Sequence, residues 1–151
     1  MRGSLKGRKQ KKMSNEQMKC VIVVDSDLPP GIVANTAAIL GATLGKNRPE
    51  IVGHDVTDAS CCTHMGVVTV PVPILKSDGE SLGALRRKLY EEHGDIMVAD
   101  FSDIAQGCKT YEEYLGKVSS TAESEHRYLG IALFGDRKTV NKLTGSMPLL
   151  R

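Results

Sequence analysis

The stretch from Cys20 to Lys46, CVIVVDSDLPPGIVANTAAILGATLGK, decides the fold class. It begins with an unbroken apolar, β-branched run over residues 20–24, which is typical of a strand covered on both faces. Pro29 and Pro30 then mark the start of a helix, because proline fits the first helical turn and nothing further in. Nearly every position up to Leu44 is small or apolar, which predicts burial on more than one side, and Gly45 is a natural end. Strand, turn and helix in this order indicate an α/β protein.

The rest of the chain alternates between strands and helices with short links. Strands are predicted over residues 50–56, 66–75, 95–101 and 128–134. Capping boxes at Ser77 and Thr110 and a cap at Asp136 predict three further helix starts. The helix after Thr110 is expected to turn a set of apolar side chains inward: Tyr111, Tyr114, Leu115 and Val118. Because strands and helices alternate, we expect a three-layer α/β/α sandwich over residues 19–151. Two predicted strands follow each other near the middle, so the sheet is expected to be mixed.

Length and composition limit the class of protein. A chain of 151 residues, 40% hydrophobic and 25% charged, suits one globular domain with an aliphatic core. Its apolar runs are too short to span a bilayer, and its basic start does not resemble a secretory signal. The four cysteines form no even framework, so we expect reduced thiols and a cytoplasmic location.

The net charge of +2 conceals an uneven distribution. Residues 1–12 carry six basic residues and no acid, so the rest has 14 basic against 18 acidic residues, a net charge of −4. We interpret residues 1–18 as a basic tail that is disordered or vector-derived. Nucleic acid is expected to bind, if at all, through this tail, since an acidic body is a poor docking surface for RNA.

Candidate site residues are polar side chains at strand ends or in apolar surroundings. Asp100 ends a buried-type strand, where the sheets of α/β proteins bind their ligands. Asn35 is an amide in an apolar helix, so it requires either a structural partner or a ligand. These two are the catalytic candidates, with Lys76 as the expected charge partner of Asp100. Further ligand contacts are expected from Gln106, Thr110 and Arg137.

Both the predicted location of the site and its chemistry follow from the strand ends. A pocket is expected where the loop over residues 25–31 meets the loop over residues 100–110.

Asp25 and Asp27 are interpreted as turn residues. Adjacent Cys61 and Cys62 would strain one tetrahedral zinc centre, so no metal is expected there. No nucleotide-binding or Ser-His-Asp motif is present, and no cofactor is expected.

Two quoted stretches carry a family resemblance. KCVIVVDSDLPPGIVANTAA (19–38) and YLGIALFGDRKTVNKLTGSMPLLR (128–151) resemble the two ends of the type II peptidyl-tRNA hydrolases. VPILKSDGESLGALRRKL (72–89) and DFSDIAQGCKTYEEYL (100–115) resemble a group of small bacterial proteins of unknown function that share that fold. The resemblance implies a type II peptidyl-tRNA hydrolase-like fold and a homodimer, which the apolar first helix also favours.

The chain departs from the hydrolases at their site. The lysine-bearing G-K-G-K run after their first strand is replaced by residues 29–32, PPGI. A hydrolase glutamine is replaced by Asn35, one methylene shorter, and the nearest equivalent of their D-A-G-x-T-Q segment is residues 100–106, DFSDIAQ, in which Asp100 has a match but the threonine has none. Losing the lysine removes a cation that would stabilise a polarised carbonyl. We therefore expect a protein that binds or processes a small polar ligand, with two alternatives: an active peptidyl-tRNA or related ester hydrolase, and a non-catalytic regulatory binding protein.

Overall fold

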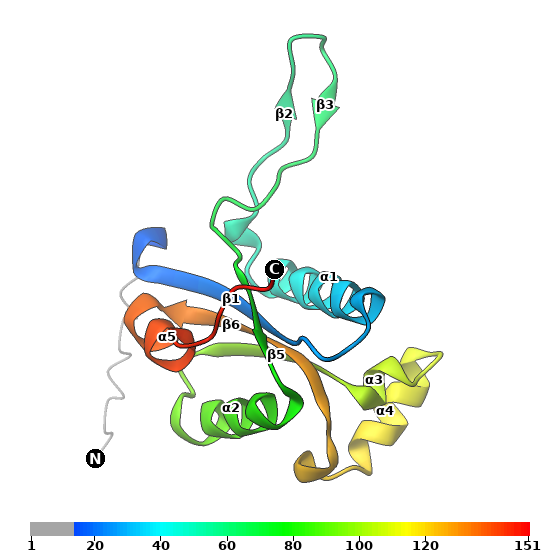
Figure 1. Ribbon diagram of the computed structural model, residues 1–151. Helices are drawn as coiled ribbons and strands as arrows, with labels where there is room; N and C mark the ends of the chain where they lie inside the picture. The colour runs from blue at the N-terminus through cyan, green and yellow to red at the C-terminus, as the bar shows by residue number, and fades with distance from the viewer. Residues whose placement is uncertain (1–13) are drawn as a thin grey trace, which may run out of the picture.

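The computed structural model describes residues 14–151, so the interpretation of residues 1–13 lies outside the described chain. Within the described part, Asn15–Gln17 form a short 3-10 turn that leads directly into the first strand, β1 (Met18–Asp25). The fold therefore includes a few residues that the sequence assigned to the tail. The termini and the main elements are shown in Figure 1.

The main sheet has four strands in the order β4-β1-β6-β5. β4 (Ile74–Ser77) runs parallel to β1, while β6 (Tyr128–Asp136) runs antiparallel to both β1 and β5 (Met97–Ser102). The sheet is mixed, as predicted, but the reason is the reversed direction of β6. The C-terminal residues cover the free edge of β4, where the Leu150 amide donates to the Ile74 carbonyl at 2.9 Å.

Helices cover both faces of the sheet, which gives the three layers visible in Figure 1. Alternate side chains of β1 point to opposite faces because the side-chain period of a strand is two. Val21 and Val23 pack with α2 (Gly79–Glu92) and α5 (Arg137–Thr144), whereas Ile22 and Val24 pack with α1 (Pro30–Asn47). The three-layer α/β/α arrangement therefore follows from the apolar run in β1.

Among the caps, Thr110 and Asp136 are confirmed and Ser77 is wrong. The Thr110 hydroxyl accepts from the Glu113 amide, and the Asp136 carboxylate accepts from the Thr139 amide. At α2 the N-cap is Asp78, whose carboxylate accepts from the Ser81 amide at 2.9 Å. Ser77 still belongs to β4, so the capping role passes to the next residue with a suitable oxygen.

Two short helices stand beside the edge strand β5. They are α3 (Asp103–Gln106) and α4 (Tyr111–Ser119), and a 3-10 turn at Glu123–Glu125 follows them before β6. The inward orientation predicted for the apolar residues of α4 is wrong for Tyr111 and Leu115, which are both exposed. The reason is position, because α4 lies beyond the edge of the sheet and packs on α3.

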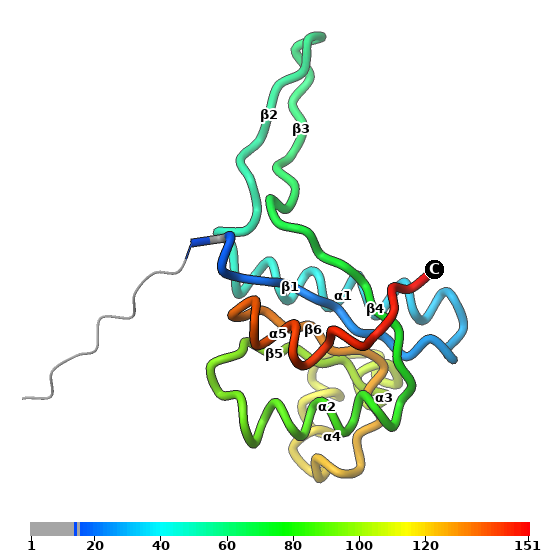
Figure 2. The backbone as a smooth tube through the Cα atoms, turned by 60° about the vertical axis from the view of Figure 1, so that its left-hand side comes forward, coloured from blue at the N-terminus to red at the C-terminus, as the bar shows by residue number. Residues whose placement is uncertain are grey.

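Of the two strands predicted over residues 50–56 and 66–75, only the end of the second joins the main sheet, at Ile74 and Leu75 of β4, so the prediction is wrong for the rest. Pro49–Ile51 form a 3-10 turn, and the chain then extends into a thin hairpin with strands β2 (Val56–Thr57) and β3 (Thr63–His64). We call residues 52–70 the arm. Figure 2 shows it projecting far from the body, and the main sheet resumes only at Ile74.

The expectation that α1 is buried on more than one side is not met within this chain. Its buried residues form one stripe: Val33, Thr36, Leu40 and Leu44. The opposite face is exposed and consists of small or uncharged residues. The helix packs tightly on the sheet at Gly130 of β6, where a Cβ atom would lie 2.6 Å from the Thr36 Cγ2 atom.

Candidate functional site

A groove of about 470 Å³ lies between α1, the end of β5 and the α3–α4 segment. Its lining combines an apolar floor with hydroxyl, thiol, amine and carboxylate groups, and the lining residues are Ile39, Thr43, Asp100, Phe101, Ala105, Cys108, Lys109, Thr110, Tyr111 and Tyr114. Seven of these residues come from α1, β5, α3 and α4 and three from the link between α3 and α4, and they converge because β5 ends and turns into α3 opposite α1. We take this groove as the candidate functional site.

Asp100 is the carboxylate of the groove, and its charge partner is Arg86 of α2. The Arg86 Nε atom donates to the Asp100 Oδ2 atom at 2.8 Å. The expected pairing of Asp100 with Lys76 is wrong, because Lys76 lies in β4 and Asp100 lies in β5, at opposite edges of the sheet. An arginine held in this way neutralises the carboxylate while leaving its second oxygen to accept from another donor.

Two tyrosines of α4 contribute phenol groups to the lining of the groove. The rings of Tyr111 and Tyr114 have centroids 5.5 Å apart. Burial raises the pKa of Tyr114 above its ordinary value, and the negative charge of Asp100 raises this pKa further. The Tyr114 phenol therefore stays protonated at neutral pH and can donate a hydrogen bond.

Three other predicted site residues lie at or beside the groove: Thr110 and Gln106, which follow β5, and Asn35 of α1. Thr110 lines the groove, although its hydroxyl oxygen already accepts from the Glu113 amide as a helix cap. The Asn35 side-chain amide donates to the Gln106 Oε1 atom at 3.4 Å, which joins α1 to α3. Asn35 therefore has a structural partner.

The loop over residues 25–31 does not line this groove, so the groove contains only one of the two loops that were predicted to form the site. Asp25 is almost fully buried at 1% exposure, and its Oδ1 atom accepts from the Asp27 amide at 3.0 Å. This contact supports the interpretation of Asp25 as a turn residue. The groove faces the second half of α1, one turn beyond Asn35.

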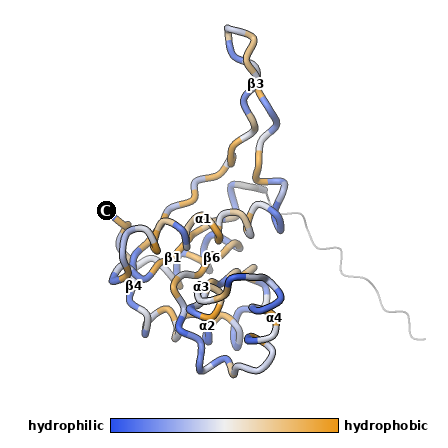
Figure 3. Tube along the Cα trace, turned by 90° about the vertical axis from the view of Figure 1, so that its right-hand side faces the viewer, coloured by the Kyte–Doolittle hydropathy of each residue, from blue (hydrophilic) through white to orange (hydrophobic). Residues whose placement is uncertain are grey.

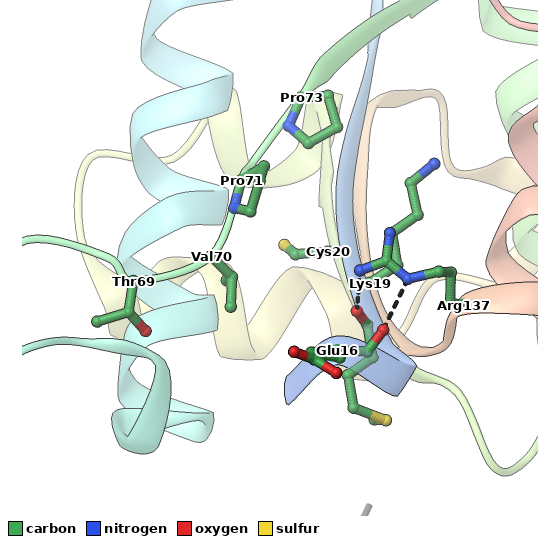
Figure 4. Close-up of a pocket in the computed structure, with 9 residues that line it drawn as sticks. Glu16, Lys19, Cys20, Thr69, Val70, Pro71, Pro73 and Arg137 are labelled. Carbon is green, nitrogen blue, oxygen red and sulfur yellow. Dashed lines mark hydrogen bonds between the residues drawn. The ribbon is translucent and has the colours of Figure 1, made fainter. Parts of the chain in front are cut away.

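Arg137 lies in a different cavity, shown in Figure 4, at the start of β1. This cavity has a volume of about 270 Å³ and lies between β1 and the segment over residues 69–73. The Arg137 Nε atom donates to the Glu16 carbonyl at 2.9 Å, and its second nitrogen donates to the Met18 carbonyl at 3.4 Å. Arg137 therefore holds the chain before β1 and is remote from Asp100, at the other end of the sheet.

Sequence reasoning missed a polar cluster at the start of β6. The buried Ser102 hydroxyl lies 3.2 Å from the His126 Nδ1 atom, and an Arg127 nitrogen lies 3.6 Å from the Asp25 Oδ2 atom. Because β6 is antiparallel, its first residues meet the carboxyl ends of β1 and β5. The direction of β6 is not readable from the sequence, so nothing there could have brought these residues together.

Tyr128 extends this cluster into the core. Its ring stacks on His126 with centroids 5.8 Å apart, and its hydroxyl donates to the Glu123 Oε1 atom at 3.2 Å. Burial raises the pKa of Tyr128 to about 12, and the carboxylates of Asp100 and Glu123 contribute to the rise. A phenol this weakly acidic serves as a fixed donor in the structure.

Among residues 14–151, no three His, Cys, Asp or Glu side chains come together in a group that could hold a metal ion. The arm's His64 instead pairs with Asp58 at 2.9 Å. No helix of the described chain is long and apolar enough to cross a membrane.

The fold is that of a mixed α/β protein, and the candidate groove lies beside the edge of its sheet. Residues 18–151 match the model of the family described as "Protein of unknown function (DUF2000)", and the chain belongs to that family. No curated protein matches it. A solved structure of a protein of unknown function from Agrobacterium tumefaciens strain C58 is similar, with a TM-score of 0.81 and 21% identity over 89% of this chain and 98% of that one. At this identity the likeness shows the fold.

Proposed function

We propose that the groove beside β5 binds a small polar molecule that also has an apolar part. The observation that carries the proposal is Asp100, a carboxylate held by Arg86 at 2.8 Å on the wall of a cavity of about 470 Å³. That volume suits a metabolite-sized ligand. Ile39 and Phe101 would contact the apolar part of the ligand.

The polar groups define which ligand chemistry fits. The free lone pairs of Asp100 accept from an amine, amide or hydroxyl, and the Tyr114 phenol donates to an oxygen of the ligand. Lys109 at the rim adds a positive charge that favours a carboxylate or phosphate. A ligand with a donor at one end and an anionic or carbonyl oxygen at the other satisfies all three residues. Cys108 lies within reach, but none of these groups forms an activated nucleophile pair, so binding is the better-supported function.

A thermal-shift screen of metabolites and nucleotides tests the proposal, because a ligand that binds the folded state raises the melting temperature. Each hit is then tested on Asp100→Asn and Tyr114→Phe, both expected to lose most of the shift. Lys76→Ala, remote from the groove, is the control and should keep it. A hit that shifts Asp100→Asn as strongly as the unaltered chain would show that it binds elsewhere.

The native cysteines provide a second readout. A ligand in the groove should slow alkylation of Cys108, which lines it, and leave the exposed Cys61 of the arm unchanged. Equal protection of both thiols, or of neither by every hit, would contradict a site in this groove.

We infer that peptidyl-tRNA hydrolysis is not the activity. A type II hydrolase-like fold stays a prediction from the resemblance, and the lysine loop of those enzymes corresponds here to Pro29, Pro30, Gly31 and Ile32. These residues begin α1 and supply no cation. Turnover of a peptidyl-tRNA at rates near those of a true hydrolase would contradict this inference.

Two further expectations concern the cellular location of the protein and its binding to nucleic acid. The four cysteines are free thiols, which supports the predicted cytoplasmic location because that compartment keeps thiols reduced. Nucleic-acid binding through the basic tail concerns residues 1–13, outside the described chain. Deleting residues 1–12 should abolish any such binding together with its salt dependence.

A further inference from the structure

The outer face of α1 is unusual for a helix exposed to water. No charged residue occurs between Asp27 and Lys46, and the exposed positions of the helix include Gly31, Ala34, Asn35, Ala38 and Ala42. We call these five residues the α1 outer face. A helix at the surface normally places charged residues on the side away from the core. The absence of charge over four turns indicates a face that another protein surface covers.

The arm is a second surface without a partner. Five of its apolar side chains are exposed, with Met65 at 84% and Val67 at 77% exposure: Val52, Val56, Met65, Val67 and Val68. Figure 3 shows hydrophobic positions along the arm well away from the body. A two-stranded hairpin standing alone in water is marginally stable at best. The exposed side chains therefore indicate that the arm packs against another molecule.

The charged side chains of the arm are exposed but already have partners within the arm, which limits the kind of partner that the arm can bind. The Asp55 Oδ1 atom accepts from the Gly66 amide at 2.9 Å, and Asp58 pairs with His64 at 2.9 Å. The sequence from Ile51 to Leu75 contains no lysine or arginine. A nucleic acid or an anionic membrane would require such cations. The arm instead suits an uncharged protein surface with small residues, which is what the α1 outer face offers.

The arm and α1 lie on the same side of the sheet. The arm leaves the body at the C-terminal end of α1, through the turn at Pro49–Ile51, and extends away from the body beyond the helix layer (Figures 1 and 2). Its base is anchored, because Ile51 is fully buried and its carbonyl accepts from the Thr69 amide at 2.7 Å. The arm therefore points away from its own α1, but it flanks the space that a molecule placed on α1 would occupy.

We propose that two copies of this chain form a two-fold dimer in which the arm of each copy packs on the α1 outer face of the other. A two-fold axis makes the same pair of surfaces meet twice, so both unpartnered surfaces are covered by one arrangement. Ala38, at the centre of the α1 outer face, lets a backbone approach closely, while Met65 and Val67 supply the apolar side chains. This dimer does not require a ligand in the groove, although the α1 outer face adjoins the groove residues Ile39 and Thr43.

Light scattering and sedimentation of the full chain test the dimer with two variants and a matched control. Ala38→Glu puts a charge on the α1 outer face, and Met65→Lys puts one on the arm; both positions are exposed, so the monomer should fold normally. Each is expected to weaken the dimer by at least about 100-fold, since an unpaired charge would be buried. Ala84→Glu, at an exposed alanine of α2, should stay a dimer with twice the 16.3 kDa chain mass.

Mixing the two variants identifies the contact. An equimolar mixture of Ala38→Glu and Met65→Lys should form a heterodimer, because one arm–helix contact is unaltered and the other brings the new carboxylate to the new ammonium. A monomeric unaltered chain at micromolar concentration would overturn the proposal and assign both surfaces to another partner. It would also be overturned by a mixture that stays monomeric, or by a Met65→Lys variant that dimerises like the unaltered chain.

Discussion

The Arg86 guanidinium of α2 and the Asp100 carboxylate of β5 form an ion pair with a separation of 2.8 Å, and their side chains are only 21% and 29% exposed. This pair joins the helix layer to the edge strand that carries the candidate site. The pair therefore holds β5 against α2, and it also determines how much of the Asp100 charge is available to a ligand in the groove.

The first prediction concerns the strength of this pair. A double-mutant cycle with Arg86→Met and Asp100→Asn is expected to give a coupling free energy of about 1–2 kcal/mol, because the pair is partly shielded from water. The control is the pair of Arg87 and Glu123, 3.9 Å apart with side chains 56% and 47% exposed, which should couple by less than about 0.5 kcal/mol. Denaturant unfolding measures both cycles. Equal coupling in the two pairs would show that Asp100 is solvated like a surface carboxylate.

The second prediction is a loss of stability at alkaline pH caused by Tyr128. Its pKa is raised from 10.0 to about 12, so above pH 10 the unfolded phenol ionises while the folded one stays neutral. The free energy of unfolding should therefore fall between pH 10 and pH 12, by about 2–3 kcal/mol from this residue. Comparison with Tyr128→Phe isolates the effect, since the variant lacks the titrating group. Parallel pH profiles for both chains would mean that the phenol is not held neutral.

The third prediction concerns Gly130, where α1 packs directly on β6. A Cβ atom at this position would lie 2.6 Å from the Thr36 Cγ2 atom and 3.1 Å from the Val23 carbonyl oxygen. Gly130→Ala is expected to lower the free energy of unfolding by about 2 kcal/mol, because the helix must move away from the sheet. Gly83→Ala in α2, where nothing lies within 4 Å of the added atom, should be neutral or stabilising. Thermal unfolding of the two variants distinguishes a tight contact at Gly130 from a loose one.

The fourth prediction is a strong difference in thiol reactivity. Burial raises the pKa of Cys20 to about 11, and the residue is 1% exposed, so it should react with an alkylating dye only after unfolding. Cys61 and Cys62 are exposed on the arm, so both should be labelled rapidly while the chain is still folded. Mass spectrometry of the labelled peptides gives each rate. Rapid labelling of Cys20 in the folded chain would indicate that the start of β1 opens to solvent.

The sequence by itself determined the layers of this protein. The apolar run of β1 requires cover on both faces of the sheet, and the structure places α1 on one face and α2 and α5 on the other. The caps at Thr110 and Asp136 were readable because a cap is a contact between residues three apart. Such local chemistry is complete within a few residues, so it can be read without knowing the fold.

Only the tertiary structure decided which strand lies beside which, and with that the site. Lys76 and Asp100 each follow an apolar run, yet the order β4-β1-β6-β5 places them at opposite edges of the sheet. Residues 52–70 lie largely within segments of strand-like composition but form the arm, because strand pairing depends on partners far away in the sequence. The groove likewise joins Ile39 to Tyr111, more than seventy positions apart in the numbering. Contacts of that kind depend on the packing of the whole chain, which periodicity and capping patterns do not encode.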